Sequence, residues 1–181
     1  MASNQLTIAS FANYRREFGP QDMNVNAARY DGDIDQMTAE DGLESWIDGP
    51  IKERQAKPQQ LPDLEAMLAN KRLWVVTTDD VLHAREKCLF GEQREAKAAK
   101  HSNLTAGNSA FAGGEVVFAD RQTIAITGSS GRYRLRSAEE LKAIEVAFAE
   151  SGYNVWSMGF NQDTNRPNVF EGNTEPEWVS I

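Results

Sequence analysis

The strongest local signal in the sequence is a capped amphipathic helix near the C-terminal end of a series of strand-like segments. Ser137 is followed three residues later by Glu140, which is the pattern of a capping box at a helix start. The apolar residues that follow recur at helical spacing and form one stripe: Leu141, Ile144, Ala147 and Phe148. Gly152 stands where a glycine often ends a helix. The sequence therefore predicts a helix between Ser137 and Gly152 that buries one face.

The segments around this helix favour strands. Residues 73–78 form a β-branched and aromatic run, and residues 81–84 can return beside it after a two-residue aspartate turn. Residues 115–118 and 123–127 flank a short turn and indicate a hairpin. Residues 153–160 predict a further strand after the helix. This order predicts an α+β fold with a small, mostly antiparallel β-sheet core and one well-defined C-terminal helix.

The first 71 residues have a different character. Residues 24–48 contain seven acidic side chains against one basic residue. Within them, residues 38–41 resemble a capping box and predict a short helix that reaches Trp46. Pro62 suits the first turn of another helix, which we expect to run through Asn70. We therefore divide the chain into an acidic, helical or irregular N-terminal region at 1–71 and an α+β core module at 72–181.

Composition excludes several classes of protein. With 19 Lys+Arg, 27 Asp+Glu and a formal charge of −8, unselective attraction to nucleic acid or an anionic membrane is disfavoured. No apolar run approaches the ~20 residues that a bilayer requires. The amino terminus lacks the basic and apolar regions of a signal peptide. We expect a cytoplasmic protein, or one exported by a specialised secretion system. The single cysteine and two distant histidines predict no metal site.

The first candidate site lies in the segment His-Ser-Asn-Leu-Thr-Ala-Gly at 101–107. There the imidazole of His101 stands beside the hydroxyl of Ser102, and such a pair can orient or deprotonate a reacting group. Glu115 opens a nearby predicted strand and completes the catalytic set. The small residues let a backbone approach a ligand, so Thr105 and Gly107 are candidate substrate contacts. The same segment also fits a polar turn in which the side chains hold neighbouring backbone groups.

The second candidate site is the segment Gly-Ser-Ser-Gly-Arg-Tyr-Arg at 128–134. A glycine- and serine-rich loop offers backbone amides to an anion, and Arg132 and Arg134 can hold a phosphate or carboxylate. Ser130 and Tyr133 complete the candidate substrate-binding residues. The segment does not match a P-loop, which ends in Lys-Ser/Thr before a helix. It also fits a turn between the predicted hairpin and the capped helix.

Several of these segments, taken in order, resemble one known module. They are the runs at 73–78 and 81–84, the seven residues at 101–107, Gly-Glu-Val at 114–116 and Ser-Gly-Arg-Tyr-Arg at 130–134. The module follows the IQ motif in plant IQ-motif-containing calmodulin-binding proteins, and it ends some bacterial secreted toxins and effectors. Its pattern reads approximately His-Ser-Ser-Phe-Leu-Ala-Gly, Ala-Gly-Glu and Ser-Gly-His-Tyr-Arg-Pro. The resemblance covers about residues 73–152.

The chain departs from this pattern at several positions, and three of the departures bear on the roles that the resemblance implies. Arg132 stands where the family has histidine, Leu135 where it has proline, and Asn103 where it has the second serine. A role that rests on the family's histidine is therefore not carried over. No IQ motif is present in the sequence, so calmodulin binding is not carried over either. The resemblance implies a toxin- or effector-type module and does not define a reaction.

One functional hypothesis is a small effector enzyme that acts on a nucleotide-type substrate such as NAD. A hydroxyl-bearing strand followed by a glutamate at the start of a later strand is the arrangement that ADP-ribosyltransferases use. Glu115 would stabilise positive charge on the ribose as nicotinamide leaves, and Ser102 would orient Glu115. His101 would contact the ribose, and one of the arginines at 132 and 134 would meet the pyrophosphate. NAD enters as substrate, and no metal takes part.

The alternative hypothesis is a non-catalytic binding module. Its acidic N-terminal half would dock a partner protein that has a basic surface, with the carboxylates steering the encounter. Trp46, Tyr30 and Phe18 would anchor the partner. The residues of the two candidate sites would then be structural and close loops around a small sheet.

Overall fold

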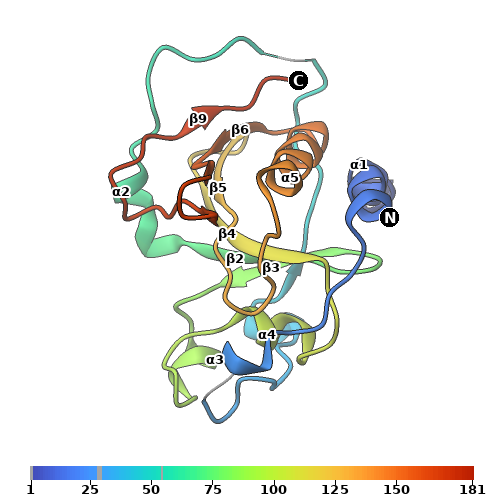
Figure 1. The fold of residues 1–181 in the computed structure, drawn as a ribbon, viewed down its shortest axis with the longest axis vertical. Helices are drawn as coiled ribbons and strands as arrows, with labels where there is room; N and C mark the ends of the chain where they lie inside the picture. Colours follow the sequence, from blue (N-terminus) through green and yellow to red (C-terminus); the bar gives the residue numbers. More distant parts are fainter. Residues whose placement is uncertain (1, 28–29, 54) are drawn as a thin grey trace.

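The computed structural model describes residues 2–27, 30–53 and 55–181. Its centre is a seven-stranded sheet in the order β1-β3-β2-β4-β5-β6-β9, and helices lie on both of its sides (Figure 1). The strands are Glu44–Ser45 (β1), Arg72–Val76 (β2), Val81–Arg85 (β3), Ala112–Phe118 (β4), Thr123–Thr127 (β5), Asn154–Ser157 (β6) and Glu177–Trp178 (β9). A separate two-stranded hairpin joins Phe160–Asn161 (β7) to Arg166–Pro167 (β8).

Two of the described α-helices are long, with 17 and 13 residues, and the others have four or five residues each. The α-helices are Ala2–Phe18 (α1), Leu64–Met67 (α2), Leu89–Glu92 (α3), His101–Thr105 (α4) and Ala138–Glu150 (α5). Three 3-10 turns add Val25–Ala27 (η1), Ala39–Asp41 (η2) and Leu68–Asn70 (η3). All strand pairs in the main sheet are antiparallel except β5 and β6, which are parallel and are connected through α5. The predicted α+β fold with a mostly antiparallel sheet and a C-terminal helix is confirmed.

One face of the sheet is covered by α1 and α5, which lie side by side in Figure 1. Phe148 of α5 stands at the centre of this core, because its ring packs edge-on against Phe11, Trp46 and Trp74 at centroid distances of 5.1, 4.9 and 5.3 Å. These residues belong to one continuous hydrophobic cluster. Alternation along the strands places Trp74 on this face and its neighbours on the other.

The opposite face carries two separate hydrophobic clusters. One contains Leu73, Val75 and Leu104 and lies under α3 and α4, and the other contains Val117 and Trp156 and lies near α2. The register of β4 explains the separation. Gly113 pairs with Val75 of the first cluster, and Val117 belongs to the second. Alternate residues of a strand share one face, so Glu115 is the β4 residue that lies between the two clusters. A polar strip therefore divides this side of the sheet.

Several local predictions are confirmed and one is wrong. The capped helix is α5, with Ser137 accepting a hydrogen bond from the Glu140 amide. The helix expected to reach Trp46 is only the turn η2, because Gly42 adopts a left-handed conformation (φ 101°) and the chain then enters β1. The segment expected to be helical through Asn70 forms α2 and η3. The 17 residues of α1 carry no clear amphipathic pattern in the sequence, and packing on α5 accounts for this helix.

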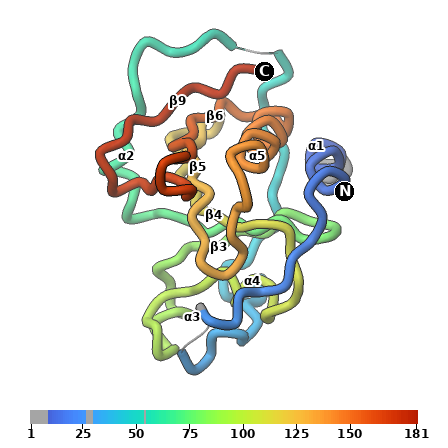
Figure 2. Tube along the Cα trace, viewed as in Figure 1, coloured from blue at the N-terminus to red at the C-terminus, as the bar shows by residue number. Residues whose placement is uncertain are grey.

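The segment between β1 and α2 runs around the β6–β9 edge of the sheet, close to the C-terminal strand (Figure 2). The Ile51 amide donates to the Gly152 carbonyl, and the Asn154 side chain donates to Gln55. These contacts attach part of the acidic N-terminal region to the end of α5 and the start of β6.

Candidate functional site

His101 lies in the first turn of α4 and is packed against β4. Its Nε2 is 2.7 Å from the Gly114 carbonyl oxygen, to which the neutral ring donates. Gly113 makes this approach possible, because a Cβ at that position would lie 2.7 Å from the His101 ring. Burial lowers the pKa of His101 to about 4, an effect that the nearby Arg132 charge reinforces. The imidazole is therefore neutral at pH 7 and is held as part of the interior.

Ser102 is fully buried on the same helix. Its hydroxyl oxygen has no hydrogen-bond partner among the residues that the structure describes. The predicted strand arrangement is wrong in two respects: Ser102 lies on a helix, and Glu115 is the fourth residue of β4 rather than its first. The helix forms there because the Asn103 side chain accepts a hydrogen bond from the Lys100 amide at the helix start. The catalytic roles given to these residues stay predictions.

Thr105 and Tyr133 connect α4 to the loop after β5. The Tyr133 hydroxyl donates to the Asn108 carbonyl at 2.6 Å and lies 2.6 Å from Thr105 Oγ1. The Gly107 amide, at φ 74°, donates to the same Thr105 oxygen. Tyr133 is fully buried, and burial raises the pKa of its hydroxyl. These candidate substrate contacts form an internal hydrogen-bonded connection.

Arg132 also points into the protein. Its Nη2 is 2.9 Å from Asp33 Oδ2, and both side chains are more than nine-tenths buried. Asn103 supports the same segment, since its side-chain amide donates to the carbonyls of Gly32, Asp33 and Asp35. In this arrangement Arg132 neutralises a buried carboxylate and fixes residues 32–35 against α4.

Glu115 occupies the polar strip between the two hydrophobic clusters. Its Oε2 is 2.5 Å from the Lys71 ammonium, which also lies 2.9 Å from Glu86. Burial raises the pKa of Glu115, and the Lys71 hydrogen bond and charge act in the opposite direction. Thr127 donates to Glu115 Oε1, and the Ser129 amide donates to Thr127 Oγ1, each at 3.2 Å. Glu115 is thereby linked through two hydrogen bonds to the loop after β5.

That loop forms one wall of an open hollow of about 510 Å³. The lining residues are Gly128, Ser129, Ser130, Gly131, Arg134, Leu135, Thr164, Asn165, Arg166, Pro167 and Val169. The first group follows the carboxyl end of β5, and the second comes from the chain after β6. The hollow therefore lies beyond the carboxyl end of β5, beside the β7–β8 hairpin that follows β6.

Two arginines give this hollow its electrostatic character. Arg134 and Arg166 are both exposed, and neither guanidinium forms an ion pair with any residue that the structure describes. They come from separate segments that line the same hollow, in a protein with a formal charge of −8. Of the predicted substrate-binding residues, Ser130 and Arg134 line the hollow. Sequence reasoning missed Arg166, since nothing in the local pattern relates the β8 hairpin to the loop after β5.

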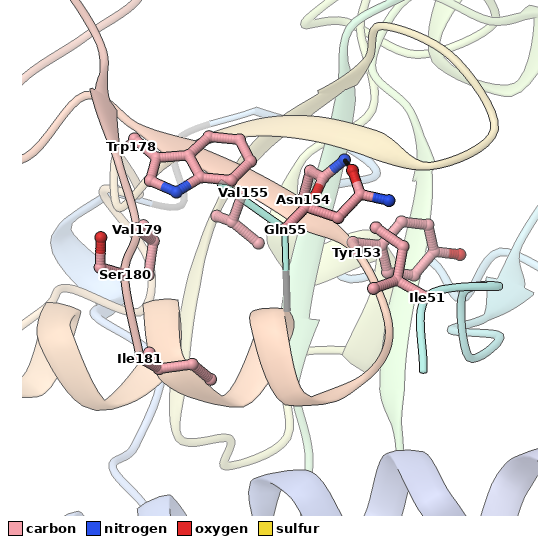
Figure 3. Close-up of a pocket in the computed structure, with 9 residues that line it drawn as sticks. All are labelled: Ile51, Gln55, Tyr153, Asn154, Val155, Trp178, Val179, Ser180 and Ile181. Atoms are coloured by element: carbon pink, nitrogen blue, oxygen red, sulfur yellow. Dashed lines mark hydrogen bonds between the residues drawn. The ribbon is translucent and has the colours of Figure 1, made fainter. Parts of the chain in front are cut away.

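A second hollow is too small for a nucleotide-type ligand. It measures about 80 Å³ and lies where the C-terminal residues pack beside the start of β6 (Figure 3). Trp178 and Val155 lie toward one end and Tyr153 and Ile51 toward the other, while the Asn154–Gln55 hydrogen bond runs between them. Typical small-molecule sites enclose roughly 300–1,000 Å³, so this space at the sheet edge is well below the size of such a site.

The three predicted docking anchors differ in exposure. Trp46 is 1% exposed and belongs to the core, so its assignment as a partner anchor is wrong. Phe18 is half-buried and stacks on Tyr14, whereas Tyr30 is 47% exposed. Trp46 is buried because it lies between β3 and α5, where its ring packs against Phe148.

Within the described part of the chain, none of the helices has the length and apolarity needed to cross a membrane. The same residues contain no group of three or more His, Cys, Asp or Glu side chains placed to hold a metal ion. Comparisons with protein-family models, curated proteins and solved structures found no match. The resemblance to the toxin and effector module therefore stays a prediction.

Proposed function

We propose that the chain binds the phosphate group of a nucleotide-type small molecule in the hollow between residues 128–135 and 164–169. The observation that carries this proposal is that two exposed arginines from separate segments, Arg134 and Arg166, are both among the residues that line one hollow, and neither forms an ion pair with a described residue. Arginine binds phosphate through two parallel N–H donors, and two arginines suit a diphosphate. The formal charge of −8 makes this local cluster of positive charge more selective, because anions are repelled elsewhere.

The serine-rich loop adds donors to the same wall. Ser130 Oγ accepts a hydrogen bond from the Tyr133 amide, which leaves its proton available to a ligand. The loop is fixed from behind, because Thr127 accepts from the Ser129 amide and the Asn24 side chain donates to the Gly131 carbonyl. Fixed donors lower the entropic cost of binding, which supports a preformed anion site.

Calorimetric titration with inorganic pyrophosphate and with AMP tests this proposal. Arg134→Gln and Arg166→Gln should each weaken binding about 10-fold or more, because each removes a charge-assisted hydrogen bond. Arg121→Gln is the matched control, since Arg121 is also exposed and lies in the turn between β4 and β5. Equal affinities for all three variants and the wild-type protein would remove the hollow from ligand binding.

We also propose that the chain acts on NAD as a transferase in which Glu115 is the acidic catalytic group. The hydrogen bonds from Ser129 through Thr127 to Glu115 support it, because they connect this carboxylate to a residue that lines the hollow. Glu115 would stabilise the ribose cation that forms as nicotinamide leaves. His101 and Ser102 would support the framework, since both are buried.

The rate of NAD consumption by Glu115→Gln and by Lys71→Met distinguishes a catalytic role of Glu115 from a structural one. Both variants break the ion pair between Lys71 and Glu115, but only the first removes the carboxylate. A transferase that uses Glu115 should lose about 100-fold or more in turnover in the first variant, and much less in the second. Equal turnover of Glu115→Gln and the wild-type protein would remove Glu115 from the mechanism.

A further inference from the structure

Helices α1 and α5 pack antiparallel and leave a groove between their outer sides. Phe11 meets Phe148 near one end of the pair, and Arg136 donates to the Gly19 carbonyl at the other end. The groove encloses about 380 Å³. It lies on the side of these helices that faces away from the sheet, because the opposite stripe of α5 is buried in the main core.

The floor of this groove is apolar and its rim is acidic. Tyr14, Ala143, Val146 and Ala147 form the floor. Three exposed carboxylates line the rim, those of Glu17, Glu139 and Glu150. Lys142 is the one cation among the described lining residues, and its ammonium lies 3.7 Å from Glu145.

A second depression lies beside the groove, and its lining includes one exposed lysine, Lys52. Ser10 and Glu150 line both spaces, and the second, also about 380 Å³, reaches residues 48–52 and 150–152. The residues that line the groove run along α5 from Glu139 to Glu150, so the groove follows this helix, which spans roughly 20 Å at 1.5 Å per residue. This length corresponds to between three and four turns of a docked helix.

We infer that this groove docks a basic amphipathic helix of a partner protein. Such helices place apolar side chains in a groove between two helices and leave their polar face at the rim. The acidic rim selects lysine and arginine on that polar face, and it disfavours a second copy of this chain, which also carries a charge of −8. This inference is independent of the phosphate-binding hollow, which lies at the ends of β5 and β6.

Fluorescence anisotropy with three designed peptides tests the inference. The first has leucine and one tryptophan on one helical face and lysine on the other, the second has glutamate in place of lysine, and the third is a scramble of the first. The first peptide should bind at least 10-fold more tightly than the other two. Its affinity should fall as salt rises, because the rim charges are exposed.

Variants of the groove locate the binding. Val146→Gln and Ala143→Gln place a polar amide on the apolar floor and should each weaken the first peptide about 10-fold at every salt concentration. Glu17→Gln with Glu139→Gln should reduce the salt dependence, while Glu175→Gln, exposed in the C-terminal tail, should leave binding unchanged. Thermal unfolding of each variant checks that it is folded.

Three results would overturn the inference. Equal binding of the scrambled peptide would indicate unselective charge attraction, and unchanged binding by both floor variants would place the peptide elsewhere. Self-association of the wild-type protein in sedimentation that Val146→Gln abolishes would make the occupant a second copy of this chain.

Discussion

The two faces of the central sheet are covered in different ways. On one face α1, α5 and Trp46 form a single aromatic core around Phe148. On the other face two smaller clusters are separated by a strip that contains the Lys71–Glu115 ion pair. The first arrangement maximises apolar contact, whereas the second leaves charged groups and hydrogen-bonded loops between its clusters. The hollow lies beyond the end of β5, and Leu135 of the continuous core also lines it.

This difference suggests a division of labour within one small fold. A continuous core supplies most of the folding free energy, because burial of apolar area is its largest favourable contribution. The divided face holds charged groups that are costly to bury and are retained with specific partners. Variants should therefore differ in kind. Loss of an aromatic side chain from the continuous core or of one partner of the buried ion pair should lower stability, whereas substitution of exposed residues at the hollow should alter binding with little loss of stability.

The largest effect is expected at the centre of the continuous core. Phe148→Ala should lower the free energy of unfolding by about 3–5 kcal/mol, since it leaves a cavity among three aromatic rings. Phe170→Ala should cost less, because Phe170 is 6% exposed and belongs to the smaller cluster near α2. Urea unfolding measures both. An equal or greater loss for Phe170→Ala would contradict the comparison.

The next effect concerns the buried ion pair on the divided face. Asp33→Asn should cost about 3 kcal/mol, because it leaves the charge of Arg132 buried without its carboxylate. Asp35→Asn is the control, since Asp35 is more than half exposed in its pair with Arg94 and should cost less than about 1 kcal/mol. Urea unfolding measures the loss of stability in both variants. Similar small losses for both variants would mean that Arg132 is solvated and available to a ligand.

The pH dependence of stability reports on His101. Its pKa is about 4 in the folded protein and 6.5 in an unfolded chain, so the unfolded state binds the proton first as pH falls. The contribution of the neutral imidazole is present above about pH 6.5 and is lost between there and pH 4, by roughly 1–3 kcal/mol. His101→Gln should remove this slope while His83, with a pKa of about 3, still contributes to both proteins. Parallel stability curves for the two proteins would show that His101 is solvated.

The smallest effect is expected at the hollow itself. Arg134→Gln and Arg166→Gln should each change the free energy of unfolding by less than about 0.5 kcal/mol, because both side chains are exposed and unpaired among the described residues. Loss of ligand binding without loss of stability would separate these arginines from Arg132. A loss above about 2 kcal/mol would instead give them a structural role.

The fold was predictable from the sequence where local signals and packing agree. The capping box at Ser137 and the apolar stripe of α5 belong to one segment, and the β-branched run of β2 is flanked by turn residues. The sequence predicts a longer helix where the structure has only the turn η2 before Gly42, because a capping pattern defines where a helix starts and not where it ends. Helix α1 escaped prediction since its stability comes from contact with α5, which is distant in sequence.

The candidate site was predictable only in part, for a related reason. Residue type showed that a glycine- and serine-rich loop with arginines can hold an anion, and Ser130 and Arg134 do line the hollow. It could not show that Arg132 turns inward to Asp33, almost a hundred residues away, or that Arg166 joins from the far side. Side-chain direction and long-range pairing depend on the complete fold, and they decide which of two neighbouring arginines meets solvent.

Chemical-shift mapping of the backbone amides during titration with pyrophosphate tests the central claim most directly. If the hollow binds phosphate, the largest changes should fall on residues 128–135 and 164–169, and they should disappear in Arg134→Gln with Arg166→Gln. Changes confined to residues 101–107, or no change at pyrophosphate concentrations that saturate the calorimetric titration, would contradict it.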